Sequence, residues 1–172
     1  MTKQEILKVA KPITFTDAMV KNTLNGNLKS FLQKAKTQPE LGVNITDFCE
    51  QAFIYNQDKK YIMCKCCNHI IDTEPKFNIG DILYVREYTA DVDGQTVYRA
   101  DFDDTPKNIK FTAPSSMSKN SARIYLQITD IDVCKFKAID KDTLVAMGFS
   151  LLDWYKNYIG YVYVFEVLNP VN

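Results

Sequence analysis

The clearest pattern of apolar and polar positions runs through residues 123–129, where the two kinds of side chain alternate. A period of two places alternate side chains on opposite faces, as in a half-buried strand. The apolar face carries Ile124, Leu126 and Ile128, and the other face carries Arg123, Tyr125 and Gln127. The pattern therefore predicts a strand with one face toward a core.

A second stretch, residues 80–88, combines turn residues with a strongly strand-like run. Gly80 and Asp81 favour a turn, and the following Ile, Leu, Tyr and Val favour a pleated surface. Arg86 and Glu87 then end the run, and charged residues there must face water, a partner or a ligand. We predict a central strand that carries Glu87 toward a binding or catalytic site.

Short helices are predicted where a capping residue precedes apolar residues at helical spacing. Thr16 or Asp17 begins the first helix, and Asn25 and Gly26 end it. Asp140 caps a second helix that stops at Gly148. A capping box of Ser150 and Asp153 predicts a third helix over residues 151–158, ended by Gly160.

The remaining strands are predicted from apolar runs bounded by turns. They cover residues 12–15, 60–64, 96–100 after a hairpin turn at 91–94, and 161–168. The last run is apolar on both faces and belongs in the body of the sheet. The order of elements predicts an α+β domain over residues 1–172, a mostly antiparallel β-barrel with short helices covering its ends. Residues 38–73 read as an insertion or lid of unassigned structure.

Composition narrows the possible functions. The 172 residues include 46% hydrophobic and 24% charged residues, with a formal net charge of +0. These values fit a globular domain and disfavour binding that depends mainly on neutralising DNA phosphates. No apolar run resembles a signal peptide or a membrane span, so we expect a cytoplasmic protein without a membrane partner.

The five cysteines favour reduced thiols or a metal over a disulfide framework. Cys64 and Cys67 have the spacing of a zinc knuckle, and His69 and Cys49 supply two further candidate ligands. Cys66 lies between Cys64 and Cys67. The alternatives are a structural zinc and a loop with partly buried thiols; no other cofactor is predicted.

Several blocks, in order, resemble the ASCH domains of phage and prophage proteins, which belong to the PUA-like barrels. The first block is residues 11–15, followed by Met19-Val20 and Leu24-Asn25-Gly26. Residues 80–87 resemble the family strand "GD-x-L-[WY]-V-R-E", and residues 97–101 resemble "VYRAD". Residues 117–130 and 162–166 resemble the later "ASRI-x-LE-[IV]-TD" and "VWV-x-EF" blocks.

The resemblance implies a barrel with a cleft between the first helix and the sheet that receives RNA or a modified nucleoside. Some relatives remove an acetyl group from the exocyclic nitrogen of cytidine with a lysine, a threonine and a strand glutamate. Aligned from Gly26, the family's lysine falls on Leu28 and its second threonine on Phe31. A slip of one residue instead brings Lys29 and Ser30 to the motif, with Glu87 as the carboxylate.

Binding residues are predicted around the same cleft. The candidates for contacting phosphate are Arg86, Arg99, Ser118, Lys119 and Arg123. The alternative is a solvated face with weak ion pairs to Glu87, Asp101 and neighbouring residues, in which Glu87 pairs with Arg86 or Arg123. Candidates for stacking on a base are Tyr84, Tyr88, Tyr98, Tyr125 and Trp154, or else these rings belong to the core.

Three functions follow as hypotheses. The first is an RNA- or nucleotide-binding ASCH-like protein whose amidohydrolase site is incomplete. The second is a hydrolase acting on modified cytidine or RNA through Lys29, Ser30 and Glu87. The third is an interaction protein of a mobile element that contacts a host factor through residues 38–73.

Overall fold

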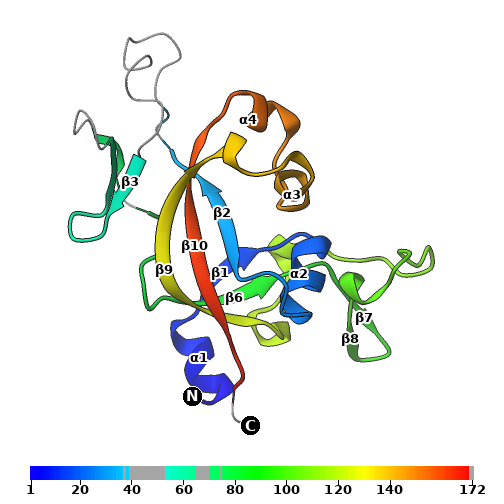
Figure 1. Cartoon of the computed structure of the whole chain (residues 1–172). Coiled ribbons are helices and arrows are strands. Elements are labelled where there is room, and N and C mark those ends of the chain that lie inside the picture. The colour runs from blue at the N-terminus through cyan, green and yellow to red at the C-terminus, as the bar shows by residue number, and fades with distance from the viewer. Residues whose placement is uncertain (37, 39–52, 65–69, 74, 171–172) are drawn as a thin grey trace.

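The protein, described here as a computed structural model, is an α+β structure organised around one five-stranded sheet (Figure 1). The described residues are 1–36, 38, 53–64, 70–73 and 75–170. The strand order is β1-β6-β9-β10-β2. These strands are β1 (Lys11–Thr14), β6 (Ile82–Arg86), β9 (Tyr125–Lys135), β10 (Ile159–Leu168) and β2 (Ser30–Lys34). Only the β1–β6 pair in this sheet is parallel, so the predicted mostly antiparallel arrangement is confirmed.

The alternation that predicts a strand at residues 123–129 is confirmed by β9. Ile124, Leu126 and Ile128 are buried in the main core, as predicted. Tyr125 points to the other face and is also buried, in a second cluster with Ile6 of α1 (Lys3–Val9). Helix α1, which begins with a Thr2–Glu5 capping box, was not predicted. Both faces of this part of the sheet are therefore covered.

β10 lies between β9 and β2, which confirms the prediction that the last apolar run is an interior strand. Gly160, however, was predicted to end a helix and instead belongs to β10. The helix α4 (Leu151–Tyr155) stops earlier, because Lys156 is its C-cap and Asn157 adopts a φ of 50°. A Cβ atom on Gly160 would lie 2.8 Å from Phe136 Cε1 and 2.9 Å from the Gln33 carbonyl oxygen. Close packing, rather than helix termination, explains this glycine.

Replacing Gly160 with alanine is expected to destabilise the protein by about 1–3 kcal/mol, because the added methyl group overpacks the core. Chemical denaturation of the two proteins measures the difference. Glu166→Ala, at an exposed position of the same strand, is the control, and we expect it to change stability by less than about 0.5 kcal/mol. Equal effects from the two substitutions would contradict the packing explanation.

Three helices begin where their capping residues predict. Thr16 caps α2 (Asp17–Leu24), Asp140 caps α3 (Lys141–Ala146), and Ser150 caps α4. The capping box of Ser150 with Asp153 is present as predicted. Capping satisfies backbone donors that a short helix leaves open, which is why these signals are readable in the sequence.

β2 was not predicted. Residues 29–36 include three lysines and only two large apolar residues, Phe31 and Leu32. The strand forms by pairing with β10, with Phe31 opposite Tyr163 and Ser30 opposite Val164. Phe31 is buried and stacks on Tyr163 with ring centroids 5.0 Å apart. Tertiary pairing, and not local pattern, determines this edge strand.

The described part of residues 38–73 contains a three-stranded sheet of β3 (Phe53–Asn56), β4 (Tyr61–Cys64) and β5 (Ile70–Thr73). β4 confirms the strand predicted at residues 60–64. The small sheet packs on the large one, since Tyr55 meets Tyr161 edge-on with centroids 5.9 Å apart and Ile62 is fully buried. Residues 41–57, whose irregular sequence pattern allowed no element to be predicted, lie mainly outside the described residues.

The predicted hairpin, with its turn at residues 91–94, is present as β7 (Thr89–Val92) and β8 (Gln95–Tyr98). The returning strand predicted at residues 96–100 ends at Tyr98, because Arg99 and Ala100 belong to a 3-10 turn. Asp93 and Gly94 form the hairpin turn with φ values of 53° and 77°. Short 3-10 turns follow at η1 (Arg99–Asp101), η2 (Pro114–Ser116), η3 (Lys119–Ser121) and η4 (Phe136–Ala138). Among the described residues, no helix has the length and apolar character to cross a membrane.

Candidate functional site

Glu87 directly follows β6 and is buried, with only 1% of its side chain exposed. Arg123, just before β9, holds it through a two-pronged hydrogen-bonded ion pair. Arg123 Nε donates to Glu87 Oε1 at 2.9 Å, and Arg123 Nη2 donates to Glu87 Oε2 at 2.9 Å. Because Val85 N–H bonds to the Ile124 carbonyl, the β6–β9 pairing places the two side chains together. Bidentate pairs of this kind are the strongest and most directional ion pairs in proteins.

The remaining faces of the Arg123 guanidinium are also occupied. Its Nη1 atom lies 2.7 Å from Asp101 Oδ1, and its plane lies 3.9 Å from the ring centroid of Tyr98. Tyr98 donates its own hydroxyl hydrogen bond to the Ser121 carbonyl at 2.8 Å. Arg123 is thus held by two carboxylates, those of Glu87 and Asp101, and by the aromatic ring of Tyr98.

A second ion pair lies beside the first. Arg99 Nε donates to Asp17 Oδ2 at 2.6 Å, and the Arg99 guanidinium covers the ring of Tyr88 at 3.4 Å. Asp17 stands in the first turn of α2, and Arg99 begins η1. We call Glu87, Arg123, Asp101, Asp17 and Arg99 the Glu87 network.

Burial dominates the electrostatics of this network. It raises the pKa of Glu87 above its ordinary value, and the hydrogen bonds and charge of Arg123 only partly oppose this. The charges of Asp101 and Asp17 raise it further. Burial also acts to lower the pKa of Arg123, but Glu87 and Asp101 outweigh it and the pKa rises. Since both carboxylate oxygens of Glu87 accept hydrogen bonds from Arg123, they are occupied by Arg123 rather than by a substrate.

Two buried polar atoms at this site have no hydrogen-bond partner within the described part of the chain. They are the acceptor Asp17 Oδ1 and the donor Arg86 Nε. Arg86 ends β6 opposite Thr14 of β1, and the Phe15 N–H donates to the Arg86 carbonyl at 3.1 Å. Buried polar atoms are usually paired, so unpaired ones indicate groups that a ligand can satisfy.

The predicted catalytic residues Lys29, Ser30 and Glu87 lie in different environments. Lys29 is exposed, and Ser30 is the first residue of β2. The two hydrogen bonds of Glu87 come from Arg123, and in the described residues no contact joins Glu87 to Lys29 or Ser30. Phe31 lies in the main core and Leu28 packs against it. The positions that carry a lysine and a threonine in the family motif thus serve packing.

The residues predicted to bind phosphate have different environments. Arg99 and Arg123 are paired with carboxylates, as the ion-pair alternative predicts. Arg86 makes one long bond, from Nη1 to the Ser115 carbonyl at 3.4 Å. Ser118 is exposed and caps η3, and Lys119 Nζ lies 5.5 Å from the ring centroid of Tyr84. Lys119 and Ser118 remain the candidates for a phosphate contact.

The aromatic residues predicted to stack on a base also have different environments. Tyr84 and Tyr125 are buried in the second cluster, as the core alternative predicts. Tyr88 and Tyr98 are half-buried within the site, each under an arginine. Trp154 lies on α4 and donates from Nε1 to the Ile139 carbonyl at 2.9 Å. Only Tyr88 and Tyr98 are therefore placed to contact a ligand at the Glu87 network.

The predicted zinc ligands are described only in part. Cys64 is fully buried in β4, whereas Cys49, Cys66, Cys67 and His69 lie outside the described residues. Within the described ranges, no group of three or more His, Cys, Asp or Glu side chains is positioned to hold a metal. The zinc hypothesis stays a prediction.

One member of the network, Asp17, was missed as a site residue and was interpreted only as a helix cap. Asp101 was named only as an ion-pair partner in the alternative to phosphate binding. Local sequence does not show either pairing, because Arg99 binds Asp17 from far along the chain and Arg123 binds Asp101 from another loop. The chain matches no protein-family model, and comparisons with curated proteins and with solved structures found no match for it.

Proposed function

We propose that this protein is an ASCH-like, PUA-type binding protein that recognises a nucleobase, in RNA or in a free nucleoside or nucleotide, at the Glu87 network. In this proposal the amidohydrolase site of some ASCH relatives is incomplete. The ordered sequence blocks and the arrangement of polar groups around Glu87 support it.

Curvature of the large sheet supports a PUA-like barrel. β1 and β2 are the two edges of the sheet, yet residues associated with both edges meet in one core. Phe15, directly after β1, contacts Phe31 of β2 edge-on with ring centroids 5.7 Å apart. A flat sheet of five strands would separate its edges by about 19 Å, at roughly 4.8 Å for each strand spacing. The sheet must therefore curl strongly toward closure.

The observation that carries the proposed function is the pair of unpartnered buried atoms, Asp17 Oδ1 and Arg86 Nε. One accepts and the other donates a hydrogen bond, and both stand where β1 leads into α2 and β6 ends. A nucleobase presents donors and acceptors side by side on its edges, and we expect it to supply partners for these atoms. Protein groups of this kind read base edges in single-stranded RNA.

The charge balance of the site favours the base over the phosphate as the anchoring group. Three carboxylates (Asp17, Glu87 and Asp101) are paired with two of the arginines, Arg99 and Arg123. An ion pair that already satisfies an arginine must break before that arginine can bind phosphate, which weakens phosphate binding. We therefore expect the affinity for a nucleoside to depend little on salt.

The test is direct binding of nucleosides and short single-stranded RNA oligonucleotides, followed by calorimetry or fluorescence anisotropy at low and physiological salt. Arg86→Met is expected to weaken binding by about tenfold or more, since losing a buried hydrogen-bond partner costs about 1–3 kcal/mol. Asp17→Asn, which changes the acceptor but keeps the shape, is expected to alter the preferred base. Matched controls are Lys107→Met and Asp103→Asn, both at exposed positions outside the network.

Three outcomes would contradict the proposal. They are absence of binding to any base, equal effects of the site variants and their controls, and an affinity that follows salt alone. Release of the acetyl group from N4-acetylcytidine, abolished by Glu87→Gln or Lys29→Ala, would instead support the hydrolase hypothesis. No specific contact in the described structure favours that hypothesis or the host-factor hypothesis.

A further inference from the structure

The segment 114–121, which contains η2 and η3, is fixed against the end of β6. Tyr84 and Arg86 stand two residues apart on this strand, so their side chains leave the same face of the sheet, the face of the second cluster. Three alternate residues of the segment contact this end of the chain. The Arg86 Nη1 atom donates to the Ser115 carbonyl at 3.4 Å, the Glu87 N–H donates to the Met117 sulfur at 3.3 Å, and Lys119 Nζ lies 5.5 Å from the Tyr84 ring centroid. Lys119 is therefore held on the same face of β6 as Arg86.

Three cations lie along this segment. Arg86 and Lys119 approach it from β6 and from η3, and Lys3 of α1 donates from Nζ to the Asn120 carbonyl at 3.1 Å. Within the described part of the chain, none of the three forms an ion pair with a carboxylate. Cations that the fold does not neutralise create a positive potential, which favours the binding of an anion.

The acids that stand close to these cations in the sequence have other partners. Glu87, next to Arg86, accepts hydrogen bonds from Arg123 on both of its oxygens. Glu5, two residues after Lys3, accepts a backbone hydrogen bond in the capping box of α1. Neither acid pairs with the three cations, so their positive charge remains available to a ligand.

Exposed hydroxyl groups accompany Arg86 and Lys119. Thr14 of β1 lies directly opposite Arg86 in the parallel register, on the same face of the sheet, and it is exposed. Ser118, next to Lys119, is also exposed. The bond from Arg86 to the Ser115 carbonyl is longer than the usual length of about 2.9 Å, so it holds the guanidinium weakly. A guanidinium, an ammonium group and hydroxyl groups are the donors that proteins use to bind phosphate.

We propose that Arg86, Lys119, Thr14 and Ser118 bind a phosphate group of the ligand, so that the protein takes a nucleotide, free or within RNA, in preference to a nucleoside. We call these four residues the phosphate seat. The inference rests on the nucleobase binding proposed above, in which the base stays the anchoring group and the phosphate adds affinity. Arg86 connects the two sites, since its buried Nε belongs to the nucleobase proposal and its Nη1 reaches the segment of the phosphate seat.

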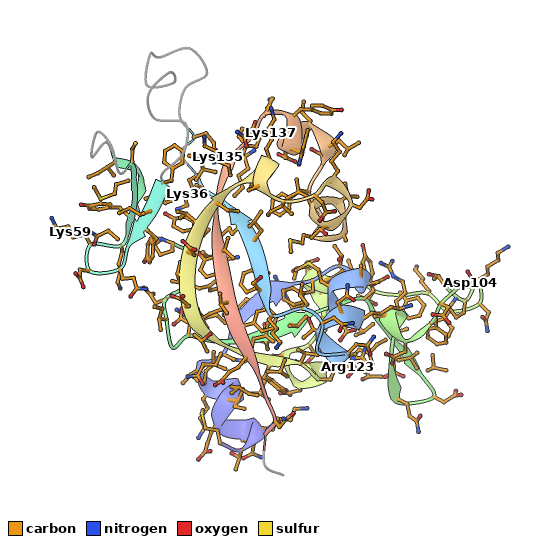
Figure 2. The ribbon with its side chains drawn as sticks, in the orientation of Figure 1. Lys36, Lys59, Asp104, Arg123, Lys135 and Lys137 are labelled. Carbon is orange, nitrogen blue, oxygen red and sulfur yellow. The ribbon has the colours of Figure 1, made fainter. Side chains whose placement is uncertain are left out.

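Calorimetry with the four ribonucleosides and with their 5′- and 3′-monophosphates, at low and physiological salt, tests the inference. For a base that binds, we expect one of its monophosphates to bind about tenfold more tightly than the nucleoside, with an advantage that shrinks as salt rises. Lys119→Met is expected to reduce this advantage by about fivefold, and Lys119→Arg to keep it, because arginine retains the charge. Lys59→Met is the matched control, since Lys59 is exposed and Figure 2 shows it on the other side of the molecule from Arg123.

Equal affinity for a nucleoside and both of its monophosphates would overturn the phosphate seat and leave nucleobase binding in place. Equal effects of Lys119→Met and Lys59→Met would also overturn the seat. Inorganic phosphate bound through Lys119, with no nucleoside bound, would support the seat and overturn the nucleobase function, and absence of binding by every probe would overturn both. Circular dichroism checks that each variant is folded, and Thr14→Val, which removes the hydroxyl but keeps the shape, is a second variant with the same expected direction.

Discussion

Replacing Arg123 with methionine is expected to lower the free energy of unfolding by about 3–5 kcal/mol at neutral pH, because the buried carboxylate of Glu87 loses its partner. Methionine keeps an unbranched apolar chain against the ring of Tyr98, so the loss reports the ion pair rather than the packing. Chemical denaturation of the variant and the wild type measures the difference. Lys107→Met, at an exposed position, is the control for the substitution type.

The effect of Arg123→Met should depend on pH. Arg123 is the main group that lowers the pKa of Glu87, so its removal allows burial to raise that pKa further above 4.5. A carboxyl group that holds its proton more tightly when folded stabilises the protein at low pH and loses this contribution as pH rises through its folded pKa. The deficit of the variant should therefore be smaller at about pH 5 than at neutral pH.

A second substitution separates loss of the ion pair from general damage. In the double variant Glu87→Met with Arg123→Met no unpaired carboxylate is buried, and Asp101 is exposed enough to remain hydrated. Replacing both partners of a buried pair by apolar groups is often nearly neutral. The double variant should thus be more stable than Arg123→Met alone. If it is not, Glu87 is held mainly by contacts other than Arg123.

Replacing Phe31 with threonine, the residue type of the amidohydrolase motif, is expected to destabilise the protein by about 3–5 kcal/mol, comparable to other Phe truncations in cores. Phe31 contacts the rings of Phe15, Tyr163, Phe77 and Phe165, with its ring centroid 5.0 to 6.1 Å from theirs. Threonine would leave a cavity and would bury a hydroxyl group among aromatic rings without a hydrogen-bond partner. Thermal or chemical denaturation measures the loss.

Phe31→Leu is the matched control, because it keeps an apolar side chain and is expected to cost less than about 1.5 kcal/mol. Leu28→Lys introduces the lysine of the motif at a half-buried site and should cost less than Phe31→Thr. A stable Phe31→Thr variant would show that the site tolerates the polar residues of the motif. A gain of deacetylation in the Leu28→Lys, Phe31→Thr protein would contradict the conclusion that these positions now serve packing alone.

The features that the sequence predicted correctly are those determined by local chemistry. The caps Thr16, Asp140 and Ser150 satisfy backbone donors in their own helices, so each helix start is readable. The alternation around Leu126 and the turn at Asp93 are likewise local. The strand that ends at Arg86 and leads to Glu87 was also placed correctly.

The features that the sequence did not predict depend on contacts between distant segments. β2 exists because β10 pairs with it, and Gly160 is a glycine because Phe136 and Gln33 approach it. At the site, the sequence left open whether Glu87 pairs with Arg86 or with Arg123, and the fold selects Arg123. Asp17 joins them from a helix whose capping pattern concealed its second role.

The sheet order has a consequence for the time course of folding. β1 must wait for β6, some seventy residues later, and β2 pairs only with β10, since Ser30 lies opposite Val164. During synthesis β1 therefore remains without its neighbour until about half of the chain has left the ribosome, and β2 until nearly all of it has. Such long loops make chain closure slow, and unpaired strands are prone to aggregate. The capped helices α1 and α2 depend on local contacts and can form early, and α2 carries the Asp17 that later joins the Glu87 network.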